Sequence, residues 1–311
     1  MTEETSLATA DSPDSATSAQ TIMIETILVG VDGSETAAYA AAWAAEEAVR
    51  RGAALTLVHA LHLPEASSAI LGPMNHAEQR RAEGRKLLDE HAATVRDTHP
   101  GLRVETELSD LSPARTLTTL GTSAGLIVTG SRGRGGFTGM LLGSVTRKLA
   151  VHTPCPLVVV PTAPAQDAAN RIVLGVGHKH SATAARYAFD TARREGAALD
   201  VVRAYFANVL YTGMAGVGTM YEGHPESDKL YALAEAKAAI EPIAAEYPDV
   251  TVNIAALEGN AVPALIDAAR GGHLLVVAAH RRRSPLPVGA GYAVDGVLAH
   301  SPVPVAVIPD R

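Results

Sequence analysis

The chain has 311 residues, a formal net charge of -7 and a sequence pI near 5.9. This length is about twice that of a usual single domain, so we expect two domains. The net negative charge argues against general binding to nucleic acid or to anionic membranes. Hydrophobic residues make up 47% of the chain and aromatic residues only 4%. This composition predicts an aliphatic core, as in helices packed on parallel strands.

The amino-terminal segment, residues 1–24, is rich in Ser, Thr, Ala, Asp and Glu. It has neither the basic start nor the apolar stretch of a signal peptide, so we expect a disordered tail. No apolar run in the sequence approaches the roughly 18 residues needed to cross a bilayer. The single cysteine, Cys155, rules out an intramolecular disulfide, and because it leads into an apolar run we expect it to be buried. These features favour a cytoplasmic protein without a membrane partner.

Residues 25–161 alternate strand-sized apolar runs with longer segments of helical period, which is the pattern of a parallel sheet with helices on both faces. The expected strands are Thr26–Val31, Ala54–Ala60, Leu102–Glu107, Gly125–Thr129 and Pro156–Val160. The expected helices are Ser34–Arg51, His76–Thr98, Ser112–Gly121 and Gly143–Val151. Ser34 is suited to cap the first helix and Gly52 to end it.

The sequence then repeats itself. Ile27–Asp32 matches Ile172–Gly177, and Leu126–Pro161 aligns without a gap on Leu274–Pro309. We therefore expect a linker over residues 162–170 and a second domain over residues 171–311. Its strands are expected near residues 171–176, 198–204, 250–256, 273–278 and 304–308. The predicted fold class is α/β, with two tandem doubly wound domains, each holding a five-stranded parallel sheet with helices on both faces.

In a doubly wound sheet, ligands bind at the carboxyl ends of the strands where the winding direction reverses, here beside the first and fourth strands of each domain. In the first domain a glycine-rich segment, residues 130–143, follows the fourth strand and precedes a helix that opens with Ser144. Glycine amides can approach an anion closely, and the start of a helix favours phosphate. The segment therefore predicts a phosphate-binding loop. The alternative is a surface loop that binds nothing.

Two common nucleotide-binding motifs are absent, namely Gly-x-x-x-x-Gly-Lys-Ser/Thr and a Gly-x-Gly-x-x-Gly after the first strand. The segment instead matches Gly-x2-Gly-x9-Gly-Ser/Thr through Gly130, Gly133, Gly143 and Ser144. With this spacing, the opening Val-Asp-Gly-Ser at residues 31–34 and the proline-flanked last strand, the chain resembles the universal stress protein family in its tandem two-domain form. The resemblance covers nearly all of the chain beyond the tail.

That resemblance implies a bound ATP with Mg²⁺ bridging its phosphates. It implies that Asp32 contacts the adenosine part, that the main chain at Val31 and Ala60 frames the base, and that Thr129 and Gly130 lie against the ribose. The residues that would hold the phosphates are Gly133, Gly143, Ser144 and Val145. The resemblance further implies that the two domains pair through their last strands, and it makes a homodimer an expectation.

Asp32 also has a simpler interpretation, because Asp-Gly-Ser is a common turn sequence and the carboxylate can begin the turn into the first helix. In the second domain, Asp32 is replaced by Gly177 and Ser144 by Tyr292. Gly130 is replaced there by Ala278 and Gly133 by Arg281, whereas Gly143 keeps a glycine counterpart, Gly291. These departures predict one nucleotide per chain, and a second domain that is structural, regulatory or specific for another ligand.

Basic residues gather in two loops of the second domain, at residues 178–180 and 280–283. They predict either solvated loops or, as an alternative, an anion or metal site. In the first domain, Arg132 and Arg134 either stabilise phosphate charge or lie exposed. Glu107 and Asp110 belong to the third strand and its following turn, so we expect no general base beside the glycine-rich loop.

The function that the sequence favours is that of an ATP-binding regulatory protein of the stress response with an unidentified protein partner. One alternative is an enzyme, such as a slow ATPase or a nucleotide-processing enzyme. The other alternative is a scaffold that needs no ligand. No nucleic acid is expected among its partners.

Overall fold

A computed structural model describes residues 25–62, 75–133, 142–161, 169–177, 181–206, 209–212, 219–222, 225–279 and 291–310. The expected tail at residues 1–24 and most of the expected linker, residues 162–168, lie outside the described residues. So do Arg134 and the two basic loops of the second domain.

The first domain contains β1 (Thr26–Gly30), α1 (Glu35–Arg51), β2 (Ala54–Ala60), α2 (Asn75–Thr98), β3 (Val104–Ser109), α3 (Pro113–Leu120), β4 (Leu126–Gly130), α4 (Ser144–His152) and β5 (Leu157–Val160). As expected, the Ser34 side chain caps α1 by accepting a hydrogen bond from the Ala37 amide, and Gly52 ends the helix in the left-handed conformation. Every expected helix of this domain is present, with bounds within one residue of the prediction.

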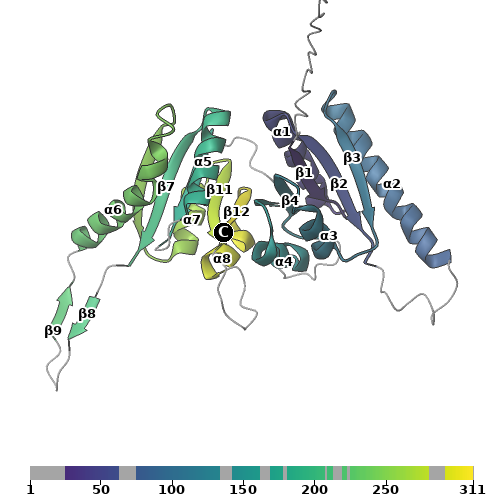
Figure 1. The fold of residues 1–311 in the computed structure, drawn as a ribbon. Coiled ribbons are helices and arrows are strands. Elements are labelled where there is room, and N and C mark those ends of the chain that lie inside the picture. Colours follow the sequence, from purple (N-terminus) through teal and green to yellow (C-terminus); the bar gives the residue numbers. More distant parts are fainter. Residues whose placement is uncertain are drawn as a thin grey trace, which may run out of the picture.

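The second domain repeats this order with one addition. It contains β6 (Arg171–Val176), α5 (Ala182–Glu195), β7 (Ala198–Tyr205), β8 (Val209–Thr212), β9 (Thr219–Glu222), α6 (Pro225–Ala244), β10 (Val252–Glu258), α7 (Ala261–Ala269), β11 (Leu274–Ala279), α8 (Tyr292–His300) and β12 (Val305–Pro309). The antiparallel pair β8–β9 was not predicted, and it projects away from the main sheet (Figure 1).

The strands form one ten-stranded sheet in the order β10-β7-β6-β11-β12-β5-β4-β1-β2-β3. Within each domain the five strands are parallel, and the winding reverses between β1 and β4 and between β6 and β11. The antiparallel pairing of β5 with β12, from Leu157 opposite Val307 to Val159 opposite Val305, joins the two halves. The predicted α/β class is confirmed, and the last strands pair within one molecule. Figure 1 shows the two domains side by side.

Helices cover both faces of this sheet because successive strand residues point to opposite sides. Ile27 and Val29 of β1 pack with α1 and α2, whereas Leu28 between them packs with α3 and α4. Each cluster continues into the second domain, to α5 and α6 on one face and to α7 and α8 on the other. Cys155 is buried, as expected. None of the helices among the described residues is long and apolar enough to cross a membrane.

The third strand of each domain starts two residues later than predicted, at Val104 and Val252. The reason is a turn before each strand. The Leu102 amide donates to the His99 carbonyl, and the Val250 amide donates to the Tyr247 carbonyl, each at 3.2 Å. The apolar residue that the sequence suggested as the first of the strand therefore belongs to the preceding turn.

The first helix of the second domain is shorter than its counterpart. Counted back from the glycines that end them, Gly52 and Gly196, α1 has 17 residues and α5 has 14. The missing residues are those of the first turn, next to the carboxyl ends of the strands.

Candidate functional site

A pocket of about 430 Å³ lies where the winding reverses in the first domain, at the carboxyl ends of β1 and β4. All nine residues that the sequence analysis expected at a nucleotide site line it, namely Val31, Asp32, Ala60, Thr129, Gly130, Gly133, Gly143, Ser144 and Val145. They lie at or just after the carboxyl ends of β1, β2 and β4 and at the start of α4, so segments more than 100 residues apart meet at one crevice. The predicted topology is what brings them together.

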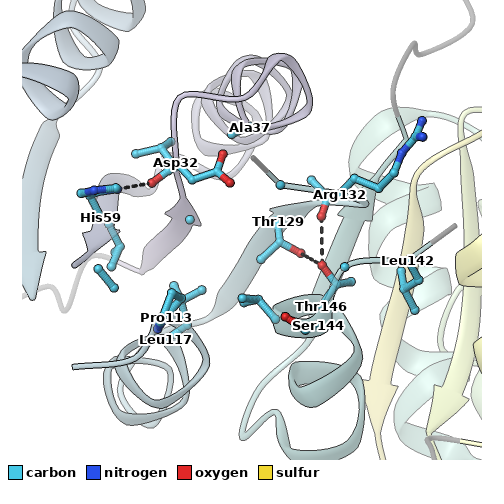
Figure 2. A pocket seen from close by; sticks show the side chains of 18 residues that line it. Asp32, Ala37, His59, Pro113, Leu117, Thr129, Arg132, Leu142, Ser144 and Thr146 are labelled. Carbon is cyan, nitrogen blue, oxygen red and sulfur yellow. Dashed lines mark hydrogen bonds between the residues drawn. The ribbon is translucent and has the colours of Figure 1, made fainter. Parts of the chain in front are cut away.

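Asp32 stands on one side of the pocket, directly after β1 (Figure 2). Its Oδ1 accepts hydrogen bonds from the amide of Ser34 at 3.0 Å and from the Ser34 hydroxyl at 2.6 Å. This is the turn that the simpler interpretation of Asp32 predicted. The carboxylate also lines the pocket, so the turn fixes the direction of a negative group that faces the ligand space.

The amino terminus of α4 stands on the opposite side of the pocket, where Figure 2 shows Ser144. Gly143 is the N-cap residue, and no side chain caps the helix. The first amides of a helix have no partner within the helix and carry its positive dipole end. Gly143, Ser144 and Val145 all line the pocket. This end of the crevice is therefore suited to an anion such as phosphate.

Two threonines that the sequence analysis did not single out hold the backbone of this site. The buried hydroxyl of Thr36 in α1 donates to the Arg132 carbonyl at 2.5 Å, and that of Thr146 in α4 donates to the Gly130 carbonyl at 3.0 Å. Thr146 also lies 3.5 Å from the Thr129 hydroxyl. These bonds tie the end of β4 to both helices. A threonine at these places has no distinctive sequence signal, because its partner is a backbone carbonyl.

His59, at the end of β2, was also missed. Its Nδ1 lies 2.7 Å from the Val31 carbonyl, and because a carbonyl only accepts, Nδ1 carries the proton. The side chain thereby fixes the backbone at the end of β1, directly before Asp32. The sequence did offer one signal for it, because His59 directly precedes Ala60, a residue expected at the site.

The glycines of the motif differ in how much space the structure leaves for a Cβ atom. A Cβ on Gly130 would lie 2.8 Å from the Thr36 carbonyl oxygen, so glycine is needed there for the close packing of α1 on β4. A Cβ on Gly133 would collide with Asp32 Oδ2. A Cβ on Gly143 would be 3.4 Å from the Ser131 carbonyl oxygen, an ordinary contact. The remaining glycines of the loop lie among residues 134–141, outside the described residues.

Of the charged residues weighed in the sequence analysis, Arg132 lines the pocket, whereas Asp110 and Glu107 do not. Arg132 is exposed, and Figure 2 shows its side chain directed away from Asp32. Asp110 pairs with Arg81 at 2.7 Å on the surface, and this hydrogen bond lowers the pKa of the Asp110 carboxyl. Neither Asp110 nor Glu107 is among the described lining residues.

The equivalent crevice of the second domain is also hollow. A pocket of about 440 Å³ is lined by Gly177, Ala278, Gly291 and Tyr292, the counterparts named in the sequence analysis. Arg281 and the neighbouring basic residues lie outside the described residues.

The fold and the two crevices define a tandem doubly wound α/β protein with a pocket at each point where the winding reverses. The model of the universal stress protein family matches residues 23–161 and 169–309. The chain therefore belongs to the universal stress protein family, in its tandem form, as the motif spacing indicated.

The chain is 31% identical over 294 residues to a universal stress protein of Mycolicibacterium smegmatis, covering 92% of this chain and 97% of the relative. It is 30% identical to a universal stress protein of Mycobacterium tuberculosis H37Rv, covering 90% of this chain and 96% of the relative. Among solved structures, a universal stress protein from Archaeoglobus fulgidus matches with a TM-score of 0.67 at 16% identity, covering 92% of this chain and 96% of that one. This last likeness shows the shared tandem fold.

Proposed function

We propose that this protein is a regulatory protein that binds ATP with Mg²⁺ in the pocket of the first domain. The supporting observation is that Asp32 and the uncapped start of α4 face each other across one crevice of about 430 Å³. The ribose hydroxyls would donate to the Asp32 carboxylate, and the phosphates would accept from the amides at the start of α4.

The base has an apolar place in the same pocket. Val58, Pro113 and Leu117 line the pocket together with the main chain at Val31 and Ala60. Pockets for small molecules are mostly apolar, with a few polar groups that fix orientation, and this lining has that character. An adenine ring would lie between β2 and α3, with its ribose toward Asp32.

Mg²⁺ fits this site only together with phosphates. Asp32 is the acidic residue among the described lining residues, and no group of three or more acidic, histidine or cysteine residues in the described parts of the chain is arranged to hold a metal. Mg²⁺ is commonly held by one or two carboxylates plus substrate phosphates. The ion would neutralise phosphate charge at the start of α4, with the Ser144 hydroxyl as a protein oxygen beside it.

A binding role is favoured over an enzymatic one because the polar lining groups already have positioning tasks. Asp32 Oδ1 holds the Ser34 turn, and His59 Nδ1 holds the Val31 carbonyl. Membership of the family supports a role in the stress response, in which nucleotide occupancy sets the affinity for a protein partner. Hydrolysis, the partner and a homodimer stay predictions.

Calorimetric titration with MgATP tests the proposal. Ser144→Asp places a carboxylate at the proposed phosphate position, and we expect it to weaken ATP binding by at least about tenfold. Tyr292→Asp is the matched control, because Tyr292 is the counterpart residue at the start of α8 and is exposed. An acidic residue in the first turn favours either helix. Equal affinities in the two variants would contradict the site.

Gly143→Asp provides an independent check. Gly143 has φ -68° and ψ 151°, which any residue adopts, and aspartate is a favourable N-cap residue. The variant should therefore fold at least as well as the parent protein and yet lose ATP binding. The parent should bind one nucleotide per chain, and a count of two would remove the proposed difference between the domains.

A further inference from the structure

The pocket of the second domain has the same place and nearly the same volume as the first, about 440 Å³ against about 430 Å³. The strand registers make the two comparable residue by residue, because Gly30 pairs with Val58 as Gly175 pairs with Val202. Val31 and Ala60 therefore correspond to Val176 and Ala204, and all four line their pockets.

Four polar residues that line the first pocket have counterparts in the second pocket without a carboxylate or an aliphatic hydroxyl. The pairs are Asp32 and Gly177, Thr129 and Val277, Ser144 and Tyr292, and Thr146 and Val294. Three hydroxyls and one carboxylate are exchanged for one phenol and three apolar residues. The apolar positions stay apolar, as Leu117 and Leu265 show.

The polar side chains among the described lining residues of the second pocket have partners within the protein. Arg203 is only 5% exposed, and it donates to Glu235 of α6 at 2.9 Å and to the Val176 carbonyl at 3.4 Å. The Ser181 hydroxyl accepts from the Ala184 amide at the start of α5. The Tyr292 hydroxyl accepts from Asn260 at 3.3 Å, at the surface.

The shorter first helix adds apolar surface on the remaining side. Because α5 begins about one turn later than α1, Ala184 and Ala185 line the second pocket, together with Ala239 of α6. Gly130 has no room for a Cβ because Thr36 in the first turn of α1 packs against it. Its counterpart Ala278 carries a Cβ and lines the second pocket. Most of the described residues that line the pocket are therefore alanine, valine and leucine.

We propose that the second domain binds an uncharged, predominantly apolar small molecule in this pocket, and that it does not bind a nucleotide there. A ribose would lose its hydration without gaining side-chain partners from Gly177, Val277 and Val294, which is unfavourable. An apolar ligand would gain by leaving water, and the pocket is large enough for a ligand of fused-ring size. The proposed occupants of the two domains differ because the carboxylate and the three hydroxyls of the first pocket have no equivalent at Gly177, Val277 and Val294 and only a phenol at Tyr292.

The test uses the full chain with saturating MgATP and the uncharged fluorescent probe N-phenyl-1-naphthylamine. We expect saturable fluorescence enhancement with one probe per chain, and no displacement by further ATP. If the folded protein shows no saturable enhancement, the proposal is wrong. ATP binding is measured separately, so failure here leaves the proposed function untouched, and failure of ATP binding leaves this proposal untouched.

Two neighbouring substitutions in β11 locate the probe. Val277→Thr restores a hydroxyl that faces the pocket, and we expect probe affinity to fall about fivefold or more, because the hydroxyl loses hydration under an apolar ligand. Val276→Thr is the matched control, since Val276 is also buried but packs on the opposite face of the sheet. Its probe affinity should be unchanged. Equal effects of the two variants would overturn the assignment.

Ala261→Phe is a second, independent variant. Ala261 lies half-buried at the start of α7 and lines the pocket. A phenyl group there occupies the ligand space from the rim and should abolish probe binding while the thermal midpoint stays near that of the parent protein. Retained probe binding in a folded Ala261→Phe protein would also overturn the proposal.

Discussion

Glu47 of α1 and Arg194 of α5 form a salt bridge of 3.1 Å between the two domains, although the Glu47 side chain is only 1% exposed. Arg51 and Arg50 of the same helix also bind this carboxylate, at 2.5 Å and 2.9 Å. Arg51 in turn donates to the Tyr187 hydroxyl of α5 at 3.1 Å. The domains are thus joined by the pairing of β5 with β12 and, on the α1–α5 face, by one buried carboxylate surrounded by arginines.

Removal of the Glu47 charge should destabilise the protein strongly. Glu47→Gln leaves Arg51 and Arg194 without their shared carboxylate, and breaking a buried ion pair on one side costs about 3 kcal/mol or more. Urea unfolding measures the loss. Glu46→Gln is the matched control, because Glu46 is 58% exposed and lies 3.7 Å from Arg50, and such pairs contribute less than about 1 kcal/mol. A loss of similar size in both variants would show that the buried cluster is unimportant.

The same carboxylate should make stability depend on acid pH. Burial raises the pKa of Glu47, but the attraction of Arg51, Arg194 and Arg50 outweighs it, and the pKa lies below its usual value. A carboxyl with a lowered pKa in the folded state contributes stability above its unfolded pKa of about 4.3, and that contribution is lost as the pH falls through the folded value.

Unfolding free energies at neutral pH and near pH 3 test this linkage. The parent protein should lose more stability than Glu47→Gln over this range, because the variant has no carboxyl to protonate at this position. Surface carboxylates with lowered pKa, such as Glu246 beside Arg186, are present in both proteins and cancel in the comparison. Parallel pH profiles of the two proteins would contradict the prediction.

Gly130 should not tolerate a side chain, although its counterpart in the second domain, Ala278, carries one. Gly130→Ala forces a Cβ to 2.8 Å from the Thr36 carbonyl oxygen and should cost about 1–3 kcal/mol through overpacking. It should also weaken ATP binding by moving α1 and the Asp32 turn. Ala278→Gly, the reverse change in the second domain, should cost no more than about 1 kcal/mol. Thermal unfolding and ATP titration of both variants check the contrast, which a tolerated Gly130→Ala would refute.

Removal of Mg²⁺ should weaken the binding of ATP more than the binding of AMP. Because Asp32 is the acidic residue among the described lining residues, most ligands of the ion must come from the phosphates. With EDTA present, we expect ATP affinity to fall several-fold while AMP affinity stays nearly constant, since one phosphate gives the ion little to bridge. Titrations of both nucleotides with and without EDTA measure this. An equal loss for AMP would place the ion elsewhere.

Local sequence signals were sufficient for the elements of each domain. The apolar runs specify the strands because a strand in a parallel sheet is covered on both sides. Ser34 and Gly52 marked the ends of α1 because capping depends on residues within one turn. The hairpin β8–β9 had a usable signal as well, two β-prone segments rich in tyrosine and threonine around the glycines of residues 213–218, but the repeat offered no counterpart for it.

The amino-acid sequence alone determined the duplicated doubly wound architecture and the nine residues expected at the first crevice, because periodicity, caps and motif spacing are local and follow one another along the chain. Only the tertiary structure decided which groups hold the site and join the domains. Thr36 meets the Arg132 carbonyl across 96 residues, and Glu47 meets Arg194 across 147. The physical reason is that a backbone carbonyl or a buried charge takes whichever partner the packing brings near, and packing depends on the whole fold.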